Sequence, residues 1–250
     1  MHNKKTIVSL IISIAFLLGS FLYLRKREIN YTPTAYEKEL ISYFKEIALH
    51  SEYDDNPNKV IKWAEPMALY IVKEEEFKPQ MSFVKKTINE INLLATDGFK
   101  IVLTDNPLKS NCILYLCKKN KVAELDQYFY EMLNDGIDYD ISGLAYSEFA
   151  TNTNIIDKSL IFINSEYSLS VQESTILEEI TQSLGLAFDS KVYPNSIFYK
   201  DKSKQKNRVR EYLQLDKDVI RLLYHPKMKP ALDSFEVNRV IKRILKSEKD

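Results

Sequence analysis

The feature that most constrains this chain is an uncharged, apolar run close to its amino terminus. Residues 6–24 contain no charged side chain, and twelve of these 19 residues are Ile, Leu, Val or Phe. A helix of this length, rising 1.5 Å per residue, is about 28 Å long, which matches the hydrocarbon core of a bilayer. Two lysines precede the run and three basic residues follow it. The pattern predicts one transmembrane anchor within residues 1–27, with the lipid bilayer as its partner.

A cleaved signal peptide is the alternative interpretation of this run. The run is longer than the apolar core of such a peptide, and no A-x-A-like cleavage site follows it. We therefore expect a retained anchor. Basic residues flank both of its ends, so the flanking charges do not fix its orientation.

The charge balance excludes one class of partner. The chain has 35 Lys and Arg against 35 Asp and Glu, but five of the basic residues and none of the acidic ones lie in residues 1–27. The remainder therefore carries 30 basic and 35 acidic side chains. Nucleic-acid binding needs a concentrated basic footprint, so we expect no nucleic-acid partner. The one basic run in the domain, residues 200–210, is expected to be a solvated loop.

Apolar periodicity divides the rest of the chain into alternating strands and helices. Residues 28–54 are expected to form a tether and an amphipathic helix, and residues 236–250 a basic C-terminal helix. The order between them predicts an α+β domain at residues 55–235, built around one mixed sheet. Cys112 and Cys117 fall on opposite faces of one strand, about 17 Å apart, so we expect no disulfide between them. The strands are expected at 67–72, 99–103, 112–117, 143–149 and 159–164, and the helices at 81–94, 122–133 and 174–184.

The last of these helices carries the most information. Ile176, Ile180 and Leu184 recur at helical spacing and predict its buried stripe. Glu178 and Gln182 are four residues apart and share a different face. A glycine follows, where a left-handed C-terminal turn is expected.

Residues 178–189, with the sequence EEITQSLGLAFD, resemble the active-site helix of the metzincin metallopeptidases. That family has the pattern H-E-x-x-H-x-x-G-x-x-H followed by an acid. Glu179 matches its general-base glutamate, and Gly185 matches its glycine. Residues 196–199, S-I-F-Y, look like its S-I-M-Y Met-turn with Phe198 at the methionine, and residues 215–224 resemble its final helix.

A second resemblance is to an uncharacterised bacterial family with an E-E-L-T-Q-x-L-G-L signature. In that family an S-I-F segment and an L-L-Y-D-P segment follow the signature. This chain has all three segments in the same order, with His225 at the position of the aspartate. The resemblance implies a zincin-like domain with an altered active site.

The departures from the metzincin pattern fall on the metal ligands. Glu178, Gln182 and Phe188 stand at the three histidine positions. Zinc in such a site needs three neutral imidazoles, and a phenyl ring cannot ligate a metal. The two oxygen-bearing side chains suit a hard cation better than zinc, and Asp189 could add a third oxygen. We therefore expect no bound zinc and no other cofactor.

Three interpretations of this helix remain open. The first is a zinc-free binding module for a peptide or cell-envelope partner, with a cleft that contains Glu178, Gln182, Phe188, Asp189 and Phe198. The second is an unusual hydrolase that uses Glu178 and Glu179 as an acid/base pair, with Glu179 as general base and a non-zinc or atypically bound metal, because water without a metal keeps a pKa near 15.7. The third is a solvated helix face with a chance similarity. By analogy with anchored envelope proteins, the domain is expected outside the cytoplasm.

Overall fold

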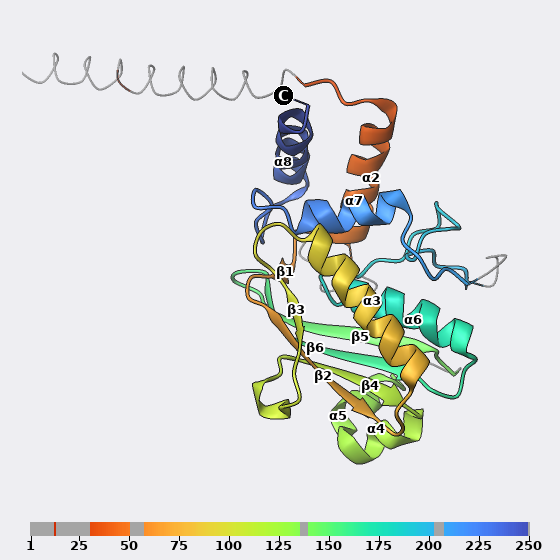
Figure 1. Ribbon diagram of the computed structural model, residues 1–250. Helices are drawn as coiled ribbons and strands as arrows, with labels where there is room; N and C mark the ends of the chain where they lie inside the picture. The colour runs from red at the N-terminus through yellow and green to blue at the C-terminus, as the bar shows by residue number, and fades with distance from the viewer. Residues whose placement is uncertain (1–12, 14–30, 51–57, 136–139, 203–207, 250) are drawn as a thin grey trace, which may run out of the picture.

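The computed structural model describes Ser13 and residues 31–50, 58–135, 140–202 and 208–249. Strands and helices alternate along most of this part of the chain (Figure 1). The strands are β1 (Lys62–Trp63), β2 (Met67–Lys73), β3 (Ile101–Leu103), β4 (Cys112–Cys117), β5 (Gly143–Ala150) and β6 (Ile155–Asn164). The helices are α2 (Ala35–Leu49), α3 (Lys78–Leu94), the 3-10 helix η1 (Pro107–Lys109), α4 (Lys119–Leu125), α5 (Gln127–Met132), α6 (Leu169–Gln182), α7 (Gln214–Leu223) and α8 (Ser234–Ser247).

The sheet is mostly parallel, so the domain is α/β, and the predicted α+β class is wrong. The strand order is β1-β6-β4-β2-β3 with every neighbour parallel, and only β5 runs antiparallel, along β6. The short connection from β3 to β4 does not form a hairpin. Strands β3 and β4 instead pair in parallel with opposite sides of β2. Strand β4 is apolar along its length and almost wholly buried, as expected of a strand covered by helices on both faces.

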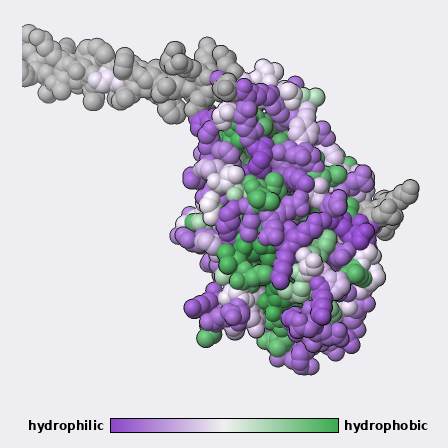
Figure 2. Space-filling view, viewed as in Figure 1, coloured by the Kyte–Doolittle hydropathy of each residue, from purple (hydrophilic) through white to green (hydrophobic). Residues whose placement is uncertain are grey.

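Two hydrophobic clusters fill the two faces of the sheet. Helices α3 and α6 cover one face, and α4 and α5 cover the other (Figure 1). Cys112 belongs to the first cluster and Cys117 to the second, and both are free thiols. The expected opposite orientation of the two cysteines is therefore confirmed. Hydrophilic residues cover most of the face in Figure 2, with apolar residues gathered near its middle.

Three further helices pack together beyond one end of the sheet. Helix α2 contacts both α7 and α8, and buried residues of all three belong to the same cluster as the strands. Thr34 and Glu37 form a capping box that starts α2, and Asp233 caps α8 in the same way. The amphipathic helix and the basic C-terminal helix expected from the sequence thus share one core with the sheet.

The structure does not support the predicted single-pass membrane protein. Across the residues described, every helix is too short or too polar to cross a membrane. The expected span, residues 6–24, lies outside the described residues except for Ser13. The described residues therefore do not support the predicted membrane anchor or the extracytoplasmic domain that was inferred from it.

Candidate functional site

Helix α6 lies under the sheet with its predicted apolar stripe buried. Ile176, Ile180 and Leu184 have no exposed surface, which confirms the helical spacing found in the sequence. The other side of the helix faces β5. A Cβ on Gly143 would lie 2.3 Å from Cγ2 of Thr175 and 3.1 Å from Cγ of Glu179. Only glycine therefore lets β5 come this close to the site helix.

Glu179, the candidate general base, is buried between α6 and β5. Its side chain is 7% exposed, and the backbone of Ala145 hydrogen-bonds its carboxyl group. Burial raises the pKa of Glu179 well above its usual value, and the nearby charges of Glu178 and Asp189 raise it further. Lys202 offsets part of this effect. Burial between α6 and β5 thus favours the protonated carboxyl more than a solvent-exposed position would.

Glu178 forms an ion pair inside the protein. Its Oε1 lies 2.8 Å from Nζ of Lys202, and the side chains of the two residues are only 12% and 21% exposed. The same ammonium donates a 2.5 Å hydrogen bond to the carbonyl oxygen of Ile197. Lys202 therefore connects the site helix to the S-I-F-Y segment. The expectation of a solvated loop at residues 200–210 is wrong for this lysine, and residues 203–207 lie outside the described part.

Gln182 and Asp189 are joined by a second internal contact. Nε2 of Gln182 donates a 2.9 Å hydrogen bond to Oδ1 of Asp189. In the part of the chain that the structure describes, no three His, Cys, Asp or Glu side chains are grouped so that they could hold a metal ion. The residues at the metzincin ligand positions therefore do not fit a zinc ion.

The two phenylalanines of the predicted cleft lie in different environments. Phe188 is half-buried, and its ring centroid is 5.5 Å from that of His50. Phe198 is fully buried, with its ring edge-on to Tyr43 at 6.5 Å. Phe198 is thus a core residue and does not line an open surface, whereas Phe188 lies near the surface.

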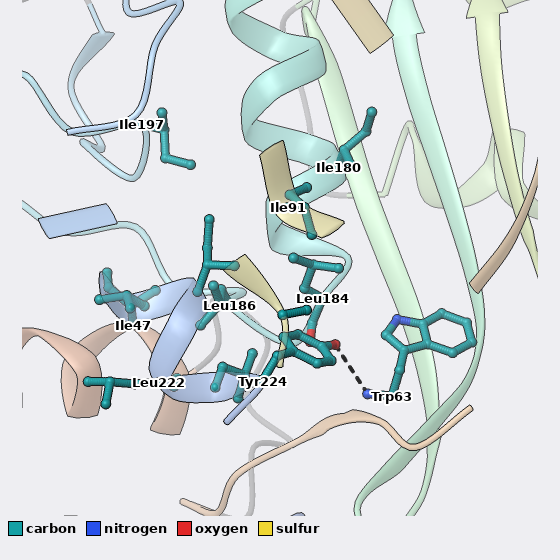
Figure 3. Packing of buried hydrophobic residues seen from close by; sticks show 14 of the residues in the cluster. Ile47, Trp63, Ile91, Ile180, Leu184, Leu186, Ile197, Leu222 and Tyr224 are labelled. Carbon is teal, nitrogen blue, oxygen red and sulfur yellow. Dashed lines mark hydrogen bonds between the residues drawn. The ribbon is translucent and has the colours of Figure 1, made fainter. Parts of the chain in front are cut away.

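Trp63 and Tyr224 come from distant segments and lie beside Leu184 at the C-terminal end of α6, where the backbone N–H of Trp63 donates to the Tyr224 hydroxyl at 3.4 Å (Figure 3). Nε1 of Trp63 donates to the carbonyl oxygen of Ser183 at 2.9 Å, and the Tyr224 hydroxyl donates to that of Leu184 at 2.9 Å. Gly185 follows with a φ of +102°, and a Cβ there would lie 2.0 Å from the carbonyl oxygen of Ile61. The L-G-L and L-L-Y motifs are therefore parts of one cap, which holds the site helix against β1.

A buried polar chain fixes the S-I-F-Y segment to α7. Oγ of Ser196 donates to Oδ1 of Asp216 at 2.7 Å and lies 2.7 Å from the hydroxyl of Tyr43. Asp216 also accepts the backbone N–H of Leu213 at the start of α7. Burial raises the pKa of Asp216 to about 6, and these hydrogen bonds limit the rise.

Sequence reasoning missed several residues that build this site. Lys202 stands in a basic run whose composition indicates solvent, and nothing in a single sequence assigns it to Glu178. Gly143 and Ala145 belong to a correctly predicted strand, but their contact with α6 depends on the sheet order. Asp216 accepts the N–H of Leu213 at the start of α7, but Leu213 is not a capping residue type, so the capping-box pattern does not identify Asp216 in the sequence.

The fold and site define an α/β protein in which the polar side chains Glu178 and Gln182 of helix α6 pair internally. The chain belongs to the DUF2927 family, described as a protein of unknown function, whose model matches residues 37–243. The match runs from the first turn of α2 into α8 and therefore includes the whole sheet and the site helix. No curated protein matches the chain.

Proposed function

We propose that this protein is a zinc-free relative of the metzincin peptidases that binds an extended peptide along β5. The observation that carries the proposal is the half-buried ion pair between Glu178 and Lys202. In this pair the ammonium group of Lys202 is held next to Glu178, the residue at the first metal-ligand position of the metzincin pattern. The binding surface is the free side of the neighbouring strand.

The internal ammonium argues against a metal at this position. A metal ion would have to bind the Glu178 carboxylate that Lys202 contacts at 2.8 Å, and the two cations would repel each other. The carbonyl oxygen of Ile197 holds the same ammonium in place. Displacing Lys202 would also cost its contact with a largely buried carboxylate. Together these contacts favour the metal-free state.

Strand β5 is suited to accept another strand. Across the described residues its only paired strand is β6, and all eight of its residues are half-buried. The backbone of Asn164 donates to the carbonyl oxygen of Ser142, just before β5 begins. Antiparallel alternation from this pair directs the backbone N–H and C=O groups of residues 143, 145 and 147 away from β6. The Ala145 backbone is already hydrogen-bonded to the Glu179 carboxyl group, so residues 143 and 147 remain for a peptide. A peptide added at this edge would bind through its main chain, with side chains providing specificity.

One observation favours a hydrolase as the second candidate. A carboxyl group with a raised pKa, such as that of Glu179, is a frequent feature of catalytic sites. The carboxyl is, however, covered by β5 and hydrogen-bonded to its backbone. Glu179→Gln separates the two functions. A binding module gives the same background peptide hydrolysis in both proteins, whereas loss of measurable hydrolysis in the variant would identify an enzyme.

Two substitutions at one residue test strand addition. Ser147→Pro removes an N–H that points away from β6, whereas Ser147→Ala keeps it, and both lose the same hydrogen bond to Ser159. A library of extended peptides is screened against the full chain, and the affinity of each hit is measured by calorimetry. We expect about tenfold weaker binding for Ser147→Pro than for Ser147→Ala, the effect of one backbone hydrogen bond. Equal affinities in two folded variants would reject strand addition at β5.

A further inference from the structure

The basic C-terminal helix predicted from the sequence forms a lysine-lined pocket with α2. Glu37 near the start of α2 pairs at 2.8 Å with Lys249, just after the end of α8, so the two helices run antiparallel. They lie side by side in Figure 1. Between them is a pocket of about 340 Å³. Its lining residues are Pro33, Lys38, Ile41, Ser42, Lys45, Asn238 and Lys242.

The charge in this pocket is of one sign. Lys38 and Lys45 come from α2 and Lys242 from α8, and none of the described residues that line the pocket is acidic. Among the described residues, none of these three lysines forms an ion pair with a carboxylate. Lys45 is partly buried, and burial together with the charge of Lys242 lowers its pKa. The ammonium groups therefore repel each other where solvent screens them incompletely.

The neutral groups of the pocket complete an anion-binding set. Ser42 lies between Lys38 and Lys45 on one face of α2, and Asn238 lies one turn before Lys242 on α8. Hydroxyl and amide N–H groups donate to oxyanions, and lysine binds them as a point charge. We propose that this pocket binds a soluble, multiply charged oxyanion of the phosphate type. Such a ligand would replace the repulsion among the lysines by attraction to a common partner.

Binding of inorganic phosphate and pyrophosphate to the full chain tests this inference. Affinity is measured by calorimetry at constant ionic strength, with chloride as the reference anion. We expect saturable binding, and about tenfold weaker binding in Lys45→Gln and in Lys242→Gln. The matched control is Lys109→Gln, which removes the same charge from an exposed position on η1 and should bind as the wild type does.

The lysine variants should also change the thermal stability of the protein without phosphate, in the direction that repulsion among the lysines predicts. In chloride, Lys45→Gln should raise the melting temperature, because it removes repulsion with Lys242, while Lys109→Gln should not. Added phosphate should raise the melting temperature of the wild type more than that of Lys45→Gln. Phosphate binding that is absent, or that Lys109→Gln weakens as much as Lys45→Gln, would overturn the proposal. A melting temperature lowered by Lys45→Gln in chloride would also count against it.

Discussion

At the scale of single residues, the structure is marked by charges held inside the protein. Lys62 is 3% exposed, and its ammonium contacts Oδ2 of Asp97 at 2.6 Å and the carbonyl oxygen of Leu223 at 2.6 Å. It also donates to the carbonyl oxygen of Met228 at 3.2 Å. Burial lowers the pKa of Lys62, and Asp97 opposes that effect. A lysine with all of its donors occupied in this way joins β1 to the end of α7.

Removing this ammonium should destabilise the fold strongly. Lys62→Met leaves a carboxylate and two carbonyl groups without their partner, and we expect a loss of about 3 kcal/mol in the free energy of unfolding. The control is Lys73→Met, which breaks the exposed pair with Glu76 and should cost less than about 1 kcal/mol. Urea unfolding measures both. Equal losses in the two variants would show that the Lys62 contacts are not stabilising.

Asp216 should make stability depend on pH in a defined direction. Its pKa of about 6 in the fold exceeds the ordinary value of 3.8, so the folded state binds this proton more tightly than the unfolded state does. The contribution is present below about pH 4 and is lost as the pH rises through about 6. Asp216→Asn should therefore reduce the pH dependence of the unfolding free energy in this window by about 2 to 3 kcal/mol. Denaturant unfolding at several pH values between 4 and 7 measures this pH dependence. The same dependence of the unfolding free energy on pH in the wild type and in Asp216→Asn would contradict the assignment.

At the scale of elements, the end of α6 is fixed by the close approach of a neighbouring segment. Gly185 and Gly98 both have a positive φ, +102° and +99°. A Cβ on Gly185 would collide with the backbone of Ile61, whereas a Cβ on Gly98 would meet nothing within 4 Å. Comparing the cost of a substitution at the two glycines therefore separates the strain of a left-handed backbone from the cost of a steric collision.

Substituting the two glycines should give unequal losses. Gly98→Ala should cost about 1 kcal/mol, the strain of a left-handed alanine. Gly185→Ala should cost about 3 kcal/mol or more, because β1 must also move away from α6. Thermal and urea unfolding measure the difference. Similar losses at both positions would mean that the contact with Ile61 is not tight.

Most elements could be predicted from the sequence, because apolar spacing reports local structure. Strand β4 was predicted at its observed bounds, and α6 carries its predicted buried stripe. The sheet order could not be predicted in this way. The connection from β3 to β4 is short enough for a hairpin, yet the two strands pair with opposite sides of β2, and only tertiary packing decides between these arrangements. The predicted α+β class was wrong for this reason.

The candidate site could be predicted only in part, because a single sequence gives local patterns but not tertiary neighbours. Glu178, Glu179 and Gln182 were found through a motif, and a motif contains residues that are near in sequence. Their partners are distant in the sequence. Lys202 lies in the connection between α6 and α7, and Ala145 lies on strand β5. A side chain's charged partner depends on the fold, so the ion pair between Glu178 and Lys202 was not visible in the sequence.

At the scale of the whole molecule, one core joins the sheet, the site helix and the helices beyond the sheet. Buried residues of α2, α7 and α8 belong to the same hydrophobic cluster as β2 and α6. The family match at residues 37–243 includes almost all of these elements. The peptide edge at β5 and the lysine pocket between α2 and α8 are thus proposed for different parts of one structural unit.

The measurement that most directly tests the zinc-free account is the metal content of the full chain. The protein is purified without chelators, incubated with equimolar zinc, desalted and analysed by plasma mass spectrometry. With Glu178 paired to Lys202 and Gln182 bonded to Asp189, we predict only traces of zinc, at the level of a denatured control. One zinc per chain, retained through desalting, would contradict the account.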